Sequence, residues 1–229
     1  MISSLKGKLW LTYCAWFRPP LEQKLREDFS ASLPPWSELG VEVADFLAST
    51  GQSNVPMREL YLLVRGLKPE IVVETGVARG GSTATILAAM DKNQKGELHS
   101  IDATKLRDPK ENDGYNTDMI GSIMRIRQHS RWHFHEGFSY DVLPALIRKF
   151  SASGQKVSLF IHDSDHSAKC VQFELFAISP AIASGGFVAS HDAFCFDNKP
   201  AFRAFERQQQ DYRIYFEGKG NEYRIYRKR

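Results

Sequence analysis

The sequence predicts an α/β domain in which helices cover both faces of a doubly wound, mostly parallel sheet. Two observations lead to this fold class. Short apolar runs typical of buried strands alternate with helical patterns of ten or more residues, which is the order of βαβ units. Two aromatic strands then follow each other without room for a helix between them, so we expect an antiparallel hairpin after the parallel strands. The domain is predicted to span residues 56–229.

The individual elements follow from their patterns in chain order. Residues 57–67 repeat apolar side chains at helical spacing, and Lys68-Pro69 ends that pattern. Five runs predict the parallel strands: EIVVETGV, ELHSIDA, RWHFHEGF, VSLFIHD and GGFVASHD. Helical patterns occupy GGSTATILAAM and residues 115–128, 140–150, 167–183 and 198–209. Residues 211–228 then form the hairpin, with GKGN at its turn.

Residues 1–55 differ from the rest of the chain. They hold two Pro-Pro pairs, three of the four tryptophans and one helical pattern, WSELGVEVADFLAST. We predict a helical N-terminal extension packed on the main domain, because so many exposed aromatic side chains would be costly. A lid over a substrate is the alternative. The same aromatic side chains are candidates for a contact between copies in a homo-oligomer.

The composition limits the partners of the chain. With 42% hydrophobic and 25% charged residues, it is typical of a globular protein. A formal net charge of +3 is too small to indicate a nucleic-acid partner. No apolar run approaches the roughly 20 residues that a membrane span needs. Three cysteines far apart form neither a disulfide framework nor a zinc motif, so we expect a reducing, cytoplasmic location.

The loop after the first strand, ETGVARGGST, carries the first binding signal. In a doubly wound sheet, ligands bind at the carboxyl ends of the strands. Gly76 and the Gly80-Gly81 pair allow a sharp turn and a close approach to a ligand, and Ser82 or Thr83 is a candidate helix cap. The loop is neither GxGxxG nor a P-loop. A carboxylate at Glu74 repels a pyrophosphate and suits a cationic ligand.

The next two strand ends extend this binding site. Asp102 lies 28 residues after Glu74, where doubly wound folds place an acid on a ribose diol. Gly137, Phe138 and Ser139 begin the helix after the third strand, and they are candidates to border an adenine ring. Each signal is weak alone, but three in order on successive strand ends are much stronger.

These motifs, together with FIHDSDH and SGGFVASHD, resemble the class I S-adenosylmethionine-dependent methyltransferases over residues 56–229. The chain is most similar to the branch with D-x-D-H on the fourth strand, which includes macrocin-type O-methyltransferases and relatives named cephalosporin hydroxylases. The resemblance implies a Rossmann-like, seven-stranded sheet and S-adenosylmethionine as cofactor. It implies that Gly76 and Gly80 approach the methionine part and that Glu74 serves its amino or backbone side. Asp102 is then expected on the ribose, and Phe138 with Ser139 at the adenine.

Asp163 and Asp192 end the fourth and fifth strands, which lie side by side in this fold. The resemblance to metal-dependent O-methyltransferases implies that carboxylates here hold a divalent ion, which lowers the pKa of a substrate hydroxyl. Oxygen ligands favour Mg²⁺. Those enzymes pair the acid on the fifth strand with a second oxygen ligand, whereas this chain has His191 beside Asp192. We predict Asp163, His191 and Asp192 as ligands of Mg²⁺ or Mn²⁺, with donation from His191 to substrate as the alternative.

Asp165 and His166 are the candidates for the general base, together with Asp163 in the catalytic group. An unperturbed histidine pKa near 6.5 suits proton removal at neutral pH. The alternative is that Ser164 and Asp165 cap a helix beginning near Ser167, with His166 in its first turn. We interpret His162, and also His133 and His135, as structural.

The resulting hypothesis is an enzyme that methylates a hydroxyl of a small molecule. Two other functions stay open: a nucleic-acid methyltransferase and a non-catalytic S-adenosylmethionine-binding protein. The chain has no NPPY-like tetrapeptide and no dense basic patch with stacking aromatics, which argues against the first. Acids at both strand ends argue against the second.

Overall fold

The computed structural model describes residues 54–78, 80–103, 129–194, 196–217 and 223–229. The expected extension (residues 1–55, apart from its last two), the expected helix at 115–128 and the hairpin turn lie outside these ranges. Five α-helices are described: α5 Asn54–Leu67, α6 Gly81–Asn93, α7 Ser139–Ala152, α8 Ala168–Ile178 and α9 Lys199–Gln208. Short 3-10 turns occupy Ser179–Ala181 and Phe196–Asn198.

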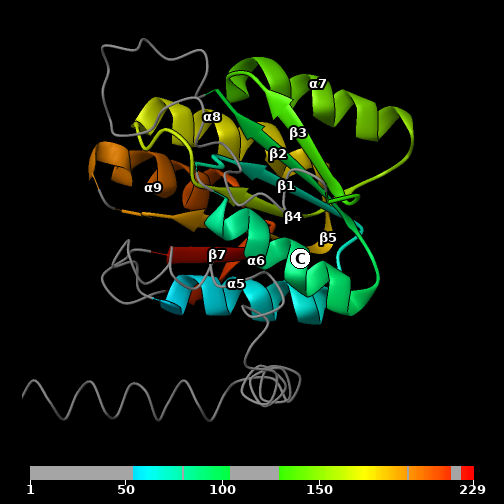
Figure 1. Cartoon of the computed structure of the whole chain (residues 1–229). Helices are drawn as coiled ribbons and strands as arrows, with labels where there is room; N and C mark the ends of the chain where they lie inside the picture. Colours follow the sequence, from blue (N-terminus) through cyan, green and yellow to red (C-terminus); the bar gives the residue numbers. More distant parts are fainter. Residues whose placement is uncertain (1–53, 79, 104–128, 195, 218–222) are drawn as a thin grey trace, which may run out of the picture.

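Seven strands form one sheet: β1 Ile71–Thr75, β2 Glu97–Asp102, β3 Trp132–Glu136, β4 Val157–His162, β5 Ile182–His191, β6 Tyr212–Glu217 and β7 Tyr223–Lys228. Their order in the sheet is β3-β2-β1-β4-β5-β7-β6, with β1 to β5 parallel and β7 antiparallel to both β5 and β6. The predicted fold class, a doubly wound sheet with an antiparallel hairpin, is confirmed (Figure 1). The strand order reverses between β1 and β4, which is where this fold binds ligands.

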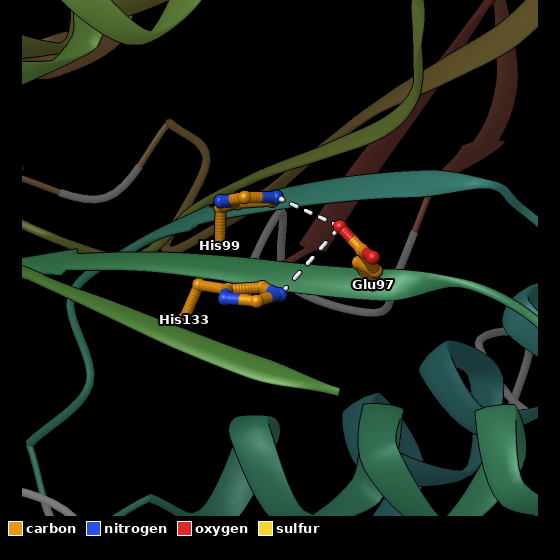
Figure 2. Close-up of side chains that lie close together, drawn as sticks. All are labelled: Glu97, His99 and His133. Atoms are coloured by element: carbon orange, nitrogen blue, oxygen red, sulfur yellow. Dashed lines mark ion pairs between the residues drawn. The ribbon is translucent and has the colours of Figure 1, made fainter. Parts of the chain in front are cut away.

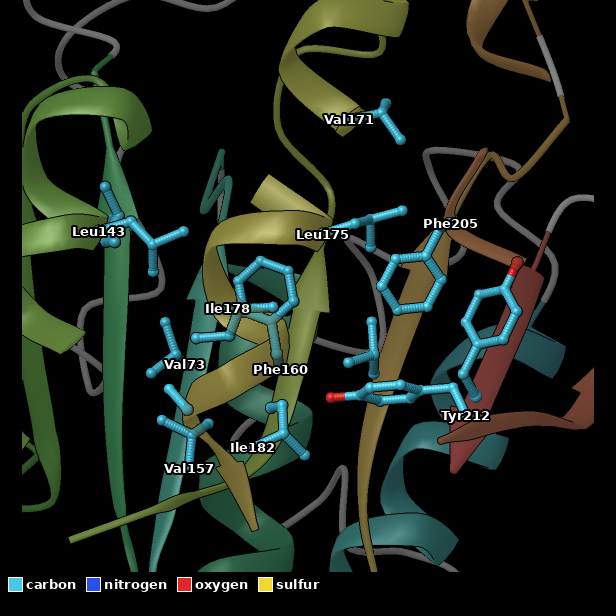
Figure 3. Close-up of a cluster of buried hydrophobic side chains, with 14 of the residues drawn as sticks. Val73, Leu143, Val157, Phe160, Val171, Leu175, Ile178, Ile182, Phe205 and Tyr212 are labelled. Carbon is cyan, nitrogen blue, oxygen red and sulfur yellow. The ribbon is translucent and has the colours of Figure 1, made fainter. Parts of the chain in front are cut away.

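Two apolar clusters hold the helices to the sheet. On one face, α5 and α6 pack on the sheet through Leu60, Val64 and Ile86. On the other face, α7, α8 and α9 cover β1, β4 and β5, with Leu175, Phe160 and other fully buried side chains between them (Figure 3). Because both faces are covered, β1 is buried at all five positions, as its continuous apolar run predicts.

The helix expected at 167–183 is shorter than predicted. It begins at Ala168, after the cap Ser167, and ends at Ile178. Pro180 follows within a 3-10 turn, and a proline has no backbone N–H to continue a helix. The fifth strand therefore begins at Ile182, three residues before the predicted Gly185.

No helix in the described part of the chain is both long enough and apolar enough to cross a membrane.

Candidate active site

The turn after β1 touches the end of β4. Gly76 has a φ of +85°, which favours glycine. A Cβ added at Gly76 would lie 1.9 Å from the backbone oxygen of Asp163, so no side chain fits there. The backbone N–H of Asp163 also donates to the carbonyl of Thr75 at 2.9 Å. The predicted cofactor loop and the predicted catalytic loop are therefore in direct backbone contact.

Gly80, and not a hydroxyl residue, is the N-cap of α6. It adopts a φ of +95° and caps the helix without a side-chain hydrogen bond. The prediction that Ser82 or Thr83 caps this helix is wrong. Both hydroxyls donate to the carboxylate of Glu74 instead, and Gly81 is buried beside them. The N-cap position of α6 therefore carries no side chain.

Glu74 is fully buried, and three hydroxyl groups donate to its carboxylate oxygens. Two of them come from α6, and the third comes from Ser100 on β2 at 2.7 Å. Burial raises the pKa of Glu74 to about 7, against the three hydroxyl donors, and the charge of Asp163 adds to the rise. Because its carboxylate is enclosed by hydroxyl groups of α6 and β2, Glu74 supports the loop that joins β1 to α6. Our prediction that Glu74 serves the amino or backbone side of the cofactor stays a prediction.

Asp102 holds the same loop from the neighbouring strand. Its Oδ2 accepts hydrogen bonds from the backbone N–H groups of Val77, at 2.7 Å, and Ala78, at 3.1 Å. Its own backbone carbonyl accepts from the N–H of Gly137 at 3.0 Å. Asp102 thus connects the first loop to the turn after β3, and the residues predicted to bind the cofactor lie along one edge of the sheet.

The turn after β3 presents an aromatic surface. Phe138 is the N-cap of α7, and its ring stacks on Tyr140 with centroids 5.1 Å apart and an interplanar angle of 8°. Tyr140 is 55% exposed, so the stacked pair reaches the surface. Ser139 is buried, with its hydroxyl 3.8 Å from the sulfur of Cys170. Tyr140 was not among our predicted residues, because a spacing of two residues does not indicate that it stacks on Phe138.

Four of the predicted catalytic and metal-binding side chains meet at the ends of β4 and β5. Nδ1 of His191 lies 3.2 Å from Oδ1 of Asp163 and 3.3 Å from Oδ2 of Asp192. Nε2 of His166 lies 3.5 Å from the same Oδ2 of Asp192. All four side chains are partly exposed, between 23% and 29%. They form one polar group open to solvent, which we call the acid–imidazole group.

The two histidines of this group have opposite pKa shifts. Burial opposes the charge of His191, but hydrogen bonding and attraction to Asp163 and Asp192 outweigh it and raise its pKa to about 10. Burial lowers the pKa of His166, and the charges of Asp163 and Asp192 offset this only in part. At neutral pH His191 is therefore a cation between two carboxylates, whereas His166 is neutral.

Asp165 lies apart from this group. Its Oδ1 accepts from the backbone N–H of Ser167 at 2.8 Å, and its Oδ2 accepts from the hydroxyl of Ser167 at 3.1 Å. Ser167 in turn caps α8 by accepting from the N–H of Cys170. Asp165 has the turn-forming role that we gave as the alternative. His166 precedes the helix, so the expectation that it lies in the first helical turn is wrong.

A buried polar network behind β4 was missed by the sequence reasoning. Glu174 of α8 is fully buried and lies 2.6 Å from Nδ1 of His162. It also accepts from the hydroxyls of Thr75, at 2.6 Å, and Ser164, at 2.7 Å. Burial would raise the pKa of Glu174, but the charge and hydrogen bond of His162, with the hydroxyl donors, lower it to about 2. The signal in the sequence was an acid within the apolar stripe of α8.

The three side chains that we predicted to bind a metal ion do not bring their ligand atoms to one point. Metal coordination requires ring nitrogens with a free lone pair, whereas Nδ1 of His191 forms ion pairs with the carboxylates on either side. Asp163, His191 and Asp192 do not bring three ligand atoms within 4.8 Å of one another. The arrangement therefore fits an internal cation better than a metal ion.

Comparison with known proteins identifies the family. A family model described as a methyltransferase domain matches residues 73–193, which is more than half of the chain. The chain belongs to the methyltransferase domain family. The matched region begins in β1 and ends directly after the acid–imidazole group. By family and fold the protein is an S-adenosylmethionine-dependent methyltransferase.

Solved methyltransferase structures share the fold at low sequence identity. An O-methyltransferase from Bacillus cereus, solved in complex with S-adenosylhomocysteine, is 14% identical with a TM-score of 0.61, over 89% of this chain and 96% of that one. A calicheamicin methyltransferase is 17% identical with a TM-score of 0.60, over 92% and 93%. A Podospora anserina methyltransferase bound to S-adenosylhomocysteine is 14% identical with a TM-score of 0.55, over 98% and 95%. No curated protein matches.

Proposed function

We propose that the protein transfers the methyl group of S-adenosylmethionine to a hydroxyl oxygen of a small molecule. The observation that carries this proposal is the position of His166. Its imidazole, held by Asp192 and neutral at neutral pH, lies in the loop whose backbone touches the cofactor loop at Gly76. A proton acceptor beside the methyl donor is what O-methylation needs, because a hydroxyl must lose its proton as it attacks.

The residues at the strand ends suit this cofactor. We propose that the stacked rings of Phe138 and Tyr140 border the adenine, that Asp102 serves the ribose side, and that Gly76, Gly80 and Gly81 lie along the methionine part. Asp102 already fixes the loop backbone through Val77 and Ala78. When bound, S-adenosylmethionine supplies an electrophilic methyl group on a sulfonium.

The chain's own side chains then perform the proton chemistry. The ring of His166 accepts the hydroxyl proton of the acceptor at the nitrogen that does not face Asp192, and Asp192 orients the ring through Nε2 and stabilises the imidazolium that forms. His191 lies between Asp163 and Asp192 and neutralises part of their charge. Asp163 lies where β4 meets the cofactor loop and is proposed to position the acceptor.

Whether turnover needs a divalent metal ion is a separate question from the identity of the base. The mechanism above contains no step through a metal ion, because the donor atoms of Asp163, His191 and Asp192 do not converge. Should Mg²⁺ or Mn²⁺ assist, these three residues would hold it. We expect turnover to survive dialysis against a chelator, and a loss that Mg²⁺ or Mn²⁺ restores would support the metal instead.

The proposed reaction is tested by measuring both cofactor binding and methyl transfer. Calorimetry measures the affinity for S-adenosylmethionine, and release of S-adenosylhomocysteine is followed with a panel of sugars, phenols and vicinal diols. We expect Asp163→Ala to abolish turnover with little loss of cofactor affinity. Normal turnover by this variant would remove Asp163 from the catalytic group. Binding without turnover on any acceptor would favour a non-catalytic cofactor-binding protein, and a salt-sensitive RNA gel shift would favour a nucleic-acid substrate.

We also propose the type of acceptor, the oligomeric state and the location of the protein. The acceptor is taken to be a small molecule, a homo-oligomer is proposed through residues 1–55, and a cytoplasmic location follows from the cysteine content alone.

A further inference from the structure

A second group of potential ligands lies far from the acid–imidazole group, at the β3 edge of the sheet. His99 of β2 pairs in register with His133 of β3, and Glu97 precedes His99 by two residues on the same face. Figure 2 shows both imidazole rings directed at the carboxylate of Glu97. Glu97 is the first residue of β2 and Asp102 the last, so along this strand Glu97 lies roughly 16 Å and His99 roughly 10 Å from the cofactor edge.

The distances within the group are those of ligands around one ion. Oε2 of Glu97 lies 3.7 Å from Nε2 of His99 and 3.5 Å from Nε2 of His133. Two ligands of a tetrahedral zinc ion at about 2.05 Å are about 3.4 Å apart. Among the described residues, only these three bring His, Cys, Asp or Glu ligand atoms within 4.8 Å of one another as a group of three.

His99 supplies an independent observation that points to a cation. Its side chain is only 4% exposed, and its Nε2 has no hydrogen-bond partner within the described ranges. The Nε2 of His133 is likewise buried and without such a partner, although that side chain is 41% exposed. A buried ring nitrogen that faces a carboxylate beyond hydrogen-bond distance needs a third group between them.

The other nitrogen of His99 is held as in a metal site. Nδ1 of His99 lies 3.0 Å from Nε2 of His135, so one of the two donates to the other. If His99 donates, its Nε2 carries a lone pair aimed at the carboxylate of Glu97, and a cation bound between the two satisfies both. Metal-binding histidines usually donate their second N–H to a carboxylate, a backbone carbonyl or a water, and here a ring nitrogen of His135 takes that place.

We propose that Glu97, His99 and His133 bind one zinc-class divalent transition-metal ion through Oε2 and the two Nε2 atoms. Two imidazoles and one carboxylate are a donor set that zinc takes in proteins, with a fourth position left for water. The nearby ammonium of Lys149 opposes the ion, and the carboxylate of Glu97 offsets it. Because β3 is an edge strand, the bound ion fastens β3 to β2 and stabilises the sheet.

The test uses the full chain, freed of metal by dialysis against a chelator. Zn²⁺ is titrated by calorimetry, and Co²⁺ is added as an optical probe of tetrahedral coordination. We expect one Zn²⁺ per chain and a rise in Tm of roughly 5–10 °C at a hundredfold excess over Kd. His133→Ala and Glu97→Gln alter exposed side chains, so the fold should survive, and each is expected to weaken Zn²⁺ binding on the order of tenfold or more.

His129→Ala is the matched control. His129 precedes the same strand but pairs with Asp91, outside the group, so its loss should leave Zn²⁺ affinity unchanged. Equal affinity in wild type, His133→Ala and Glu97→Gln would overturn the proposal. Loss of Zn²⁺ binding in His191→Gln alone would also overturn it, because the ion would then belong to the acid–imidazole group.

Discussion

His191 lies within 3.3 Å of a carboxylate oxygen on both Asp163 and Asp192, and thus joins the ends of β4 and β5 through one charged ring. Asp163 and Asp192 alone would repel each other across the two strand ends. The imidazolium between them holds them together and leaves Asp192 able to contact His166.

This relationship predicts a pH dependence of stability. The pKa of His191 rises from about 6.5 in the unfolded chain to about 10 in the folded protein. Its contribution is therefore fully present below pH 6.5 and is lost as the pH rises through 10. We expect the free energy of unfolding of wild type to fall towards that of His191→Gln across this window, measured by urea denaturation at successive pH values. A constant difference between the two proteins would contradict the assignment.

Replacing His166 should separate chemistry from binding. His166→Gln removes the proposed base, so we expect kcat to fall by roughly 10²–10⁴-fold, with the Kd for S-adenosylmethionine within about twofold of wild type. Asp165→Ala is the control from the same loop, because Asp165 forms only the turn before α8. It should keep kcat and lose about 1 kcal/mol of stability. The reverse pattern would make Asp165 the base.

Glu174 is predicted to matter for stability although it lies behind the strands. Glu174→Gln keeps the shape but removes the charge that partners His162, and breaking a buried pair costs about 3–5 kcal/mol. Gln172→Ala, at an exposed position of the same helix, should change stability by less than about 0.5 kcal/mol. Equal stability of the two variants, measured by thermal and urea unfolding, would mean that the network contributes little.

Gly76 should tolerate no side chain. Gly76→Ala adds a Cβ at positive φ and places it 1.9 Å from the carbonyl oxygen of Asp163. Gly154→Ala is the control, because Gly154 has a φ of +71° but nothing within 4 Å of an added Cβ. We expect a cost of about 1 kcal/mol at Gly154 and more than about 3 kcal/mol at Gly76. Similar Tm values for the two variants would show that the loops can move apart.

Much of the fold could be predicted because its signals are local. Apolar runs separated by helical patterns fix the order of strands and helices, and the hairpin follows from two strands with no room for a helix. The end of α8 was missed because an apolar run through Ile182 reads equally well as helix or strand. Only the proline within it distinguishes the two.

The site was predicted in position but less well in detail. Strand ends identify Asp102, Asp163 and Asp192, since parallel strands bring their carboxyl ends to one edge of the sheet. Partners within that edge depend on side-chain directions that spacing does not specify. Asp165 and His166 are adjacent in the chain, yet Asp165 accepts hydrogen bonds from Ser167 whereas His166 contacts Asp192. The role of Glu174 depends on tertiary packing against His162, which no single segment reveals.

The pairing of β5 with β7 has a consequence for how the enzyme is made. His191 pairs in register with Tyr223, which the ribosome adds 32 residues later. Strands β1 to β5 and every residue of the acid–imidazole group are therefore synthesised before the strand that pairs with β5 on its other side. A nascent chain paused before β7 would carry all of its proposed catalytic side chains. Its β5, which ends at His191, would lack the strand that pairs with its outer edge. Activity is thus expected to arise only after β7 has left the exit tunnel.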